Sequence, residues 1–291
     1  MPAALEIRGL KKRYGAFALG PLDLTLPPGT IYGFVGPNGA GKTTTLDLIF
    51  GMGAKDGGDI RVLGLDHLQD EVAVKQQVGY VSPDLNYSPW SKVRRVIQFV
   101  KAFYPTWDND YCDRLLRSLR VGRDERVMSL SFGSRIKLSL ILALAWRPRL
   151  LILDEPLVGL DAISKQEVFS ELLDAVSDGE RSVLISSHNL TDVERFADRL
   201  GLIVDGRMLV EGTTADVIDR HRMVDFVAAG DFEIDVRPGV FVQHREANRW
   251  RVLLDLRQVP IDWLRQAGAT QIADAPVTLE ELFVAIGRDR Q

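Results

Sequence analysis

The chain has 291 residues, enough for one large domain or for a domain with a small appendage. Its formal net charge of −4 excludes the overall positive field with which nucleic-acid-binding proteins collect phosphates. The single cysteine, Cys112, excludes an internal disulfide and favours a reducing cytoplasm.

No membrane-inserting segment is expected. The first residues lack a long apolar run after their positive charges, so a signal peptide is not predicted. The most apolar helical stretch, LSLILALAW, lies between Lys137 and Arg147 and falls well short of the roughly 20 residues needed to cross a bilayer.

The N-terminal third predicts a strand, a glycine loop and a helix in succession. Residues 4–10 and 22–26 alternate apolar and polar side chains, which predicts half-buried strands. The segment IYGFVG at 31–36 predicts a buried strand that runs into GPNGAGKT at 36–43, and KTTTLDLIFGM has helical spacing. This order is the context that a P-loop requires.

The middle of the chain predicts a helical insertion in an α/β core. Helical patterns extend from about Pro89 to Trp146. The α/β alternation then returns with strands LLILD (150–154), SVLISS (182–187) and GLIVD (201–205), separated by helical segments. Such alternation predicts a mostly parallel sheet covered by helices.

Residues from about 218 onward predict a small α+β appendage. Short strands are expected at 231–236, 240–244 and 250–256, and helices at 260–268 and 278–287. Thr278 and Glu281 predict a capping box at the start of the last helix.

The glycine loop predicts a phosphate-binding site. Its pattern is formed by Gly36, Gly41, Lys42 and Thr43. A glycine-rich turn lets backbone N–H groups surround a phosphate chain. Lys42 would add positive charge at the β and γ phosphates, and Thr43 would offer its hydroxyl to Mg²⁺. The helix from Thr44 onward presents the positive end of its dipole.

Two carboxylates supply what hydrolysis needs beyond phosphate binding. Asp154 ends the apolar strand and is suited to Mg²⁺, and Glu155 follows it and is suited to polarising the attacking water. The preceding apolar residues bury the strand and direct its end toward the edge where α/β sheets bind ligands.

With these motifs in place, the sequence resembles the nucleotide-binding subunit of an ABC transporter over roughly residues 4–215. It carries LSFGS at 130–134 where the family has its signature, usually LSGGQ. GLD at 159–161 matches the D-loop, and SSHNLTDVERFADRL matches the switch-histidine segment around His188.

The resemblance implies a fold and a domain division. The expected fold is the α/β P-loop NTPase domain of an ABC ATPase, spanning residues 1–217, with an antiparallel β subdomain and a helical subdomain at about 89–146. A C-terminal accessory domain is expected at 218–291.

The resemblance also assigns ATP-binding roles. It implies that Asn38, Gly39 and Thr44 contact the nucleotide along with the other loop residues. Tyr14 stands where the family places an aromatic side chain that stacks on adenine, a contact that needs only a flat ring. His188 stands where the family contacts the γ phosphate, for which a neutral imidazole can donate one hydrogen bond.

The signature implies a head-to-tail dimer in which each ATP lies between one P-loop and the partner's signature. Ser131 and the Gly133 N–H are therefore expected to contact the partner's γ phosphate at a helix N-terminus. Phe132 and Ser134 depart from the usual Gly and Gln.

The Q-loop departs further, because Pro83 stands where the family has glutamine and Asp84 follows it. Asp84 could reach a metal-bound water or be a solvated loop residue. The effect of this change on coupling to transport is left open.

FYPTWD at 103–108 and VTLEELFVAI at 277–286 resemble stand-alone ATPase subunits of bacterial exporters of drugs and lantibiotics. This implies a second ATPase subunit, a separate transmembrane permease, and a peripheral place on the cytoplasmic face of the cell membrane, with no nucleic acid. Two alternatives remain: a non-transport or regulatory ABC ATPase, or a poorly hydrolysing member of a heterodimer. Glu155 and His188 count against poor hydrolysis, and the altered signature counts for it.

Overall fold

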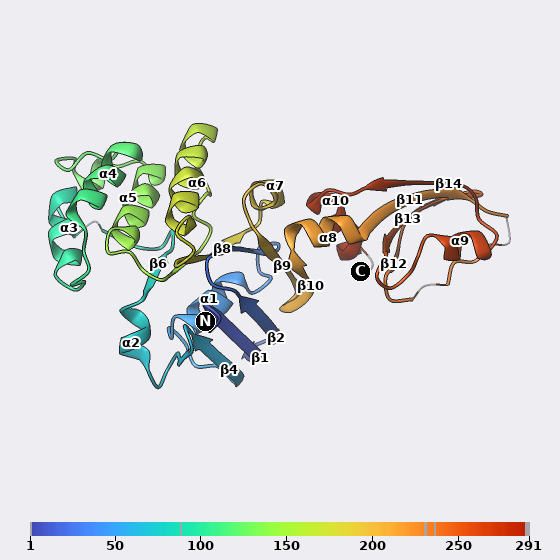
Figure 1. Ribbon diagram of the computed structural model, residues 1–291, viewed down its shortest axis with the longest axis horizontal. Helices are drawn as coiled ribbons and strands as arrows, with labels where there is room; N and C mark the ends of the chain where they lie inside the picture. Colours follow the sequence, from blue (N-terminus) through green and yellow to red (C-terminus); the bar gives the residue numbers. More distant parts are fainter. Residues whose placement is uncertain (1, 88, 230–231, 236, 289–291) are drawn as a thin grey trace. The chain divides into compact units, whose positions relative to one another are not determined.

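The computed structural model describes residues 2–87, 89–229, 232–235 and 237–288, and these form two compact units (Figure 1). The first unit comprises Met1–Asn189 and Phe196–Leu209, and the second comprises Leu190–Arg195 and Val210–Gln291. The expected domain boundary at 217/218 stays a prediction.

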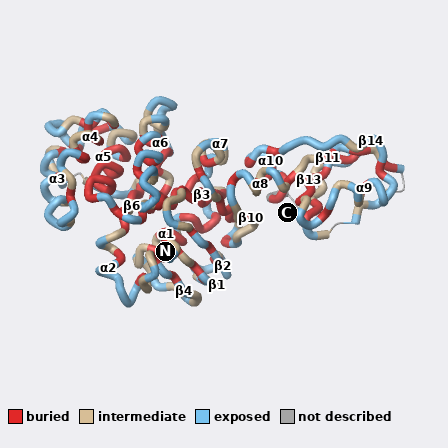
Figure 2. The backbone as a smooth tube through the Cα atoms, viewed as in Figure 1, coloured by how far each residue is buried: buried red, intermediate tan, exposed pale blue. Residues whose placement is uncertain are grey.

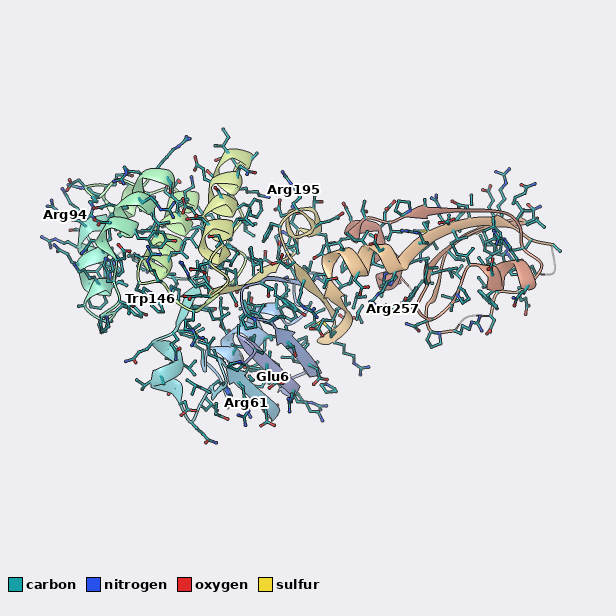
Figure 3. All side chains as sticks on the ribbon, in the orientation of Figure 1. Glu6, Arg61, Arg94, Trp146, Arg195 and Arg257 are labelled. Carbon is teal, nitrogen blue, oxygen red and sulfur yellow. The ribbon has the colours of Figure 1, made fainter. Side chains whose placement is uncertain are left out.

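An antiparallel sheet opens the first unit, in the order β2-β1-β4-β5. Its strands are β1 (Leu5–Tyr14), β2 (Phe17–Leu26), β4 (Gly57–Val62) and β5 (Leu65–Asp66). Polar partners such as Glu6 and Arg61 face each other across β1 and β4 (Figure 3), while the alternate positions are apolar and buried. This is the antiparallel β subdomain expected from the sequence.

A six-stranded sheet with the order β10-β9-β3-β8-β7-β6 forms the centre of the fold. Its strands are β3 (Ile31–Val35), β6 (Val78–Val81), β7 (Leu150–Leu153), β8 (Ser182–Ser187), β9 (Arg199–Val204) and β10 (Arg207–Thr213). The pairings among β6, β7, β8, β3 and β9 are parallel, so the carboxyl ends of these strands meet at one edge of the sheet.

Helices α1 (Lys42–Ile49), α2 (Glu71–Lys75) and α6 (Ala162–Val176) accompany these sheets. Leu24 of β2, Phe34 of β3 and Leu46 of α1 belong to one buried apolar cluster. That shared core fixes the helix after the glycine loop against both sheets.

The helical insertion contains α3 (Val93–Lys101), α4 (Asn109–Ser118), the short 3₁₀ helix η1 (Val127–Ser129) and α5 (Phe132–Leu144). Every residue of α5 from Ile136 to Leu144 is buried (Figure 2), because α3, α4 and α6 each pack against it. The apolar run that is too short to cross a membrane is therefore a core helix. Among the described residues, no helix is long and apolar enough to span a bilayer.

The second unit is built on a four-stranded antiparallel sheet in the order β12-β13-β11-β14. Its elements are α7 (Leu190–Glu194), α8 (Thr214–Arg220), β11 (His221–Val227), β12 (Val240–Glu246), β13 (Arg249–Asp255), α9 (Asp262–Gln266), β14 (Thr270–Pro276) and α10 (Leu279–Arg288). Phe226, Trp250 and the partly buried Phe232 form part of its own apolar core.

The expected capping box is present. The Glu281 N–H donates to Thr278 Oγ1 at 3.2 Å, and the Thr278 N–H donates to Glu281 Oε2 at 2.9 Å. The strand expected at 231–236 differs: residues 231 and 236 lie outside the described residues, and 232–235 form no strand. Strands β11 and β14 were not predicted.

Candidate active site

The glycine loop leaves the carboxyl end of β3 and leads into α1. A Cβ atom on Gly36 would lie 2.1 Å from the carbonyl oxygen of Ile203, so only glycine fits there. Gly41 immediately precedes α1 with a φ of 103°, a left-handed conformation that a side chain would strain. Backbone packing therefore explains two glycines that the sequence assigned to phosphate binding.

A cavity of about 220 Å³ lies beside this loop and brings together most of the predicted ATP-binding residues. Its lining residues are Phe17, Asn38, Gly39, Gly41, Lys42, Thr43, Thr44 and Glu155. Phe17 is the member of this set that the sequence analysis did not single out.

Lys42 is buried and its ammonium group is held by the loop itself. Nζ donates to the carbonyl oxygens of Gly36 at 2.8 Å and Pro37 at 3.2 Å. It also forms an ion pair with Glu155 Oε1 at 3.1 Å. These contacts place one positive charge at the base of the cavity.

Asp154 lies at the end of β7 between two hydroxyl groups. Thr43 Oγ1 donates to Asp154 Oδ2 at 2.8 Å, and Ser186 Oγ donates to Asp154 Oδ1 at 2.6 Å. The predicted metal ligands Thr43 and Asp154 thus meet, although they are far apart in the sequence. Hard oxygen donors of this kind suit Mg²⁺.

Ser186 was missed by the sequence analysis. Besides bonding Asp154, its Oγ accepts the N–H of Glu155 at 2.9 Å. The available signal was the serine pair at 186–187, which follows the apolar residues 183–185 of β8; a hydroxyl group buried there needs a partner.

Glu155 lies between the lysine and the histidine. Its φ is 45°, a left-handed conformation that is uncommon for a residue with a side chain. Glu155 Oε2 lies 2.9 Å from Nδ1 of His188, whose side chain is 47% exposed. The carboxylate is thus held by a cation on one side and an imidazole on the other.

Negative charge gathers around Asp47, in the second turn of α1. Burial is the largest cause that raises the pKa of Asp47, and the charges of Asp154 and Asp84 raise it further, while a hydrogen bond from Tyr80 opposes the shift. The Tyr80 hydroxyl donates to Asp47 Oδ1 at 3.2 Å. A divalent cation near Asp154 would offset this accumulated charge.

Comparison with known proteins agrees with this geometry. Residues 19–158 match the family model described as ABC transporter. The Nod factor export ATP-binding protein I of Paraburkholderia xenovorans is 33% identical over 303 residues, covering 99% of each chain. The chain belongs to the ABC transporter family.

Two further comparisons cover most of the chain. The ABC transporter ATP-binding protein YtrB of Bacillus subtilis is 28% identical over 284 residues, 97% of each chain. A solved structure titled "Structure of ATP binding subunit of ABC transporter" aligns with a TM-score of 0.67, covers 74% of this chain and 92% of that chain, and is 24% identical, which supports the fold. The predictions of an ATP-binding subunit and of an ATPase are confirmed.

In this ABC ATPase, Tyr14 and Phe17 are cross-strand neighbours at the turn between β1 and β2. Phe17 lines the cavity, whereas Tyr14 is 53% exposed with Lys12 Nζ 4.9 Å from its ring centroid. The stacking of Tyr14 on adenine stays a prediction. Phe17 is an additional aromatic residue at the same turn.

The signature of this ABC ATPase is not among the residues that line the cavity of its own chain. Ser131 is the N-cap of α5: its Oγ accepts the Ser134 N–H at 3.0 Å and lies 2.9 Å from Ser134 Oγ. Gly133 follows in the first turn. Both residues are at a helix N-terminus, as expected.

Asp84 is exposed and also lies outside the list of residues that line the 220 Å³ cavity. Its N–H donates to Ser82 Oγ at 3.3 Å, just after β6. Its charge nevertheless acts on Asp47, so both interpretations of Asp84 stay open.

Proposed function

We propose that this ABC ATPase dimerises head to tail around ATP, hydrolyses it, and drives export through a separate transmembrane permease. The observation that carries this proposal is Glu155, held between Lys42 and His188 at the rim of a glycine-lined cavity. The export direction is supported by the full-length similarity to a Nod factor export protein.

The residues of the cavity divide the chemistry among them. Lys42 and the backbone N–H groups of the loop bind the β and γ phosphates. Thr43 and Asp154 hold Mg²⁺, which when bound neutralises phosphate charge, and Asp84 adds negative charge nearby. Glu155 accepts a proton from the attacking water, and His188 holds the carboxylate and reaches the γ phosphate.

Dimerisation completes the site. Ser131 and Gly133 of one subunit contact the γ phosphate bound by the other, where the N-terminus of α5 favours negative charge. The adenine ring stacks on Tyr14. The ATPase acts at the cytoplasmic face of the cell membrane, bound to its permease and not to nucleic acid, with an accessory domain from about residue 218.

The first test is the Glu155→Gln variant, which we expect to bind Mg-ATP and stall before hydrolysis. Light scattering after size exclusion measures its mass with and without Mg-ATP. We expect ATP to convert the 32.5 kDa monomer to a species of twice that mass. ATP binding without a change of mass would contradict the head-to-tail homodimer.

Glu180→Gln is the matched control. Glu180 is an exposed glutamate in the loop before β8, at the end of that strand opposite to His188. This variant should hydrolyse ATP like the wild type and should show no stable ATP-bound dimer.

A further inference from the structure

Phe132 is the aromatic residue that replaces a glycine in the usual signature, and its ring packs on the loop after Glu155. A Cβ atom on Gly159 would lie 3.0 Å from Cδ1 and 3.2 Å from Cε1 of Phe132. The ring therefore occupies the space that a side chain at position 159 would need. Phe132 is still 39% exposed, so this contact accounts for only part of its surface.

A second contact runs in the opposite direction. A Cβ atom on Gly133 would lie 2.8 Å from Cδ2 of Leu160. A side chain of the signature thus packs on a glycine of the loop after Glu155, and a side chain of that loop packs on a glycine of the signature. The signature and the loop at 155–161 interlock more closely than two segments bearing ordinary side chains could.

The loop at 155–161 is short and internally bonded. The Val158 N–H donates to the Glu155 carbonyl at 3.3 Å, and the Leu160 N–H donates to the Leu157 carbonyl at 3.3 Å. Its last residue, Asp161, is the N-cap of α6. Because these hydrogen bonds connect the loop residues, a displacement of Gly159 also shifts the backbone of Glu155. That backbone already has an uncommon left-handed conformation.

Phe132 also borders a third segment. Together with Ser82–Asn86 and residues of α5, it lines a cavity of about 300 Å³. This segment follows β6 and contains Pro83 and Asp84, where the family's glutamine is missing. One exposed aromatic ring thus adjoins the signature, the loop after Glu155 and the altered Q-loop.

We propose that Phe132 is a positioning residue for ATP hydrolysis, which holds Glu155 in place through Gly159 and so ties the signature to the catalytic carboxylate of the same subunit. The proposal rests on the proposed function, in which Glu155 assists hydrolysis. Phe132 acts on the loop and leaves ATP binding at Lys42 and Thr43 unaffected.

A double-mutant cycle with Phe132→Ala and Gly159→Ala tests this contact in the full-length protein. Steady-state kinetics give kcat and KM for Mg-ATP, and thermal unfolding gives Tm. We expect each single change to lower kcat about fivefold or more, with KM within about twofold of wild type. Contacting residues couple by 0.5–3 kcal/mol, or roughly 2- to 150-fold.

The double variant distinguishes contact from general damage. The left-handed backbone at Gly159 strains alanine equally in both backgrounds, but the clash with the ring is gone once Phe132 is alanine. The kcat of the double variant should therefore be higher, by about threefold or more, than the value obtained by multiplying the two single losses. Phe132→Tyr, which keeps the ring, should retain most of the activity and serves as the second variant if Phe132→Ala folds poorly.

The proposal would be overturned if the kcat of the double variant equalled the product of the two single losses. It would also be overturned if Phe132→Ala raised KM and left kcat unchanged. Phe103→Ala is the control, because it truncates another exposed aromatic residue of the same helical insertion and should leave kcat unchanged.

The mass assay on Glu155→Gln keeps the two proposals distinguishable: if that variant dimerises while the cycle is additive, only the role of Phe132 fails. If it stays monomeric while the cycle is coupled, only the dimer fails.

Discussion

At the scale of single residues, the hydroxyl group of Ser186 connects both carboxylate residues of the active site. It donates to Asp154 Oδ1 at 2.6 Å and accepts the Glu155 N–H at 2.9 Å, and the side chain is fully buried. Ser186→Ala leaves a buried carboxylate oxygen and a backbone N–H without these partners, which costs about 1–3 kcal/mol. We expect kcat to fall at least about tenfold, because Glu155 then loses the bond that fixes its backbone.

The control for this prediction is Ser182→Ala at the other end of β8. Ser182 is also buried, and its Oγ accepts the N–H of Gly29 at 3.0 Å. Both variants should lower Tm by a few degrees, as measured by circular dichroism, but only Ser186→Ala should lower kcat. Equal kcat values in the two variants would contradict a specific role for Ser186.

The residues that the sequence predicted and those that it missed differ in a physical way. Lys42, Asp154 and Glu155 could be found because their chemistry is carried by short motifs at strand ends. Ser186 and Phe17 could not, because their roles arise from neighbours across β-strand pairs, which sequence spacing does not reveal.

At the scale of elements, helix α4 buries the chain's one cysteine. Burial raises the pKa of the Cys112 thiol to about 11, and its side chain is fully inaccessible. The thiolate is the reactive form, and an unfolded cysteine has a pKa of about 8.5. At pH 8 we therefore expect iodoacetamide to label Cys112 only at urea concentrations that unfold the helical insertion. The intact mass of the protein measures the labelling.

Asp110→Cys supplies the control for this labelling, because position 110 is exposed on the same helix. That variant should gain one label rapidly in the native protein and a second only on unfolding. Rapid native labelling of Cys112 itself would mean that α4 opens far more readily than its packing implies.

The strands predicted best are those that are buried on both faces and carry a short apolar run. The strands β3, β7 and β8 are buried along their whole length and were expected as strands. β14 was missed because nearly all of its residues are exposed, so it carries no alternating apolar pattern. β11 was missed because it follows α8 directly, without turn residues to mark its start.

At the scale of the whole molecule, the second unit includes a segment from inside the ATPase sequence. Helix α7 packs with α10, and the Leu279 N–H donates to Glu194 Oε2 at 3.2 Å. A chain ending at residue 217, the boundary expected from sequence, lacks α10. We expect amide hydrogen exchange in 190–195 to accelerate in that chain while exchange in the glycine loop at 36–43 stays unchanged.

A substitution provides the matched control for this truncation. Glu194→Gln weakens the bond to Leu279 but keeps α10, so it should raise exchange in 190–195 less than the truncation does. Unchanged exchange in the truncated chain would show that α7 does not depend on the second unit.

The grouping of α7 with the second unit also constrains how the sequence can evolve. His188 is followed at once by Asn189 and then by Leu190–Arg195, which belongs with the residues after Val210. A recombination event that replaces only residues 210–291 would pair α7 with an α10 from a different sequence. Among related sequences, residues 190–195 should therefore covary with the C-terminal unit more strongly than with the histidine beside them, and a functional chimera must exchange both segments together.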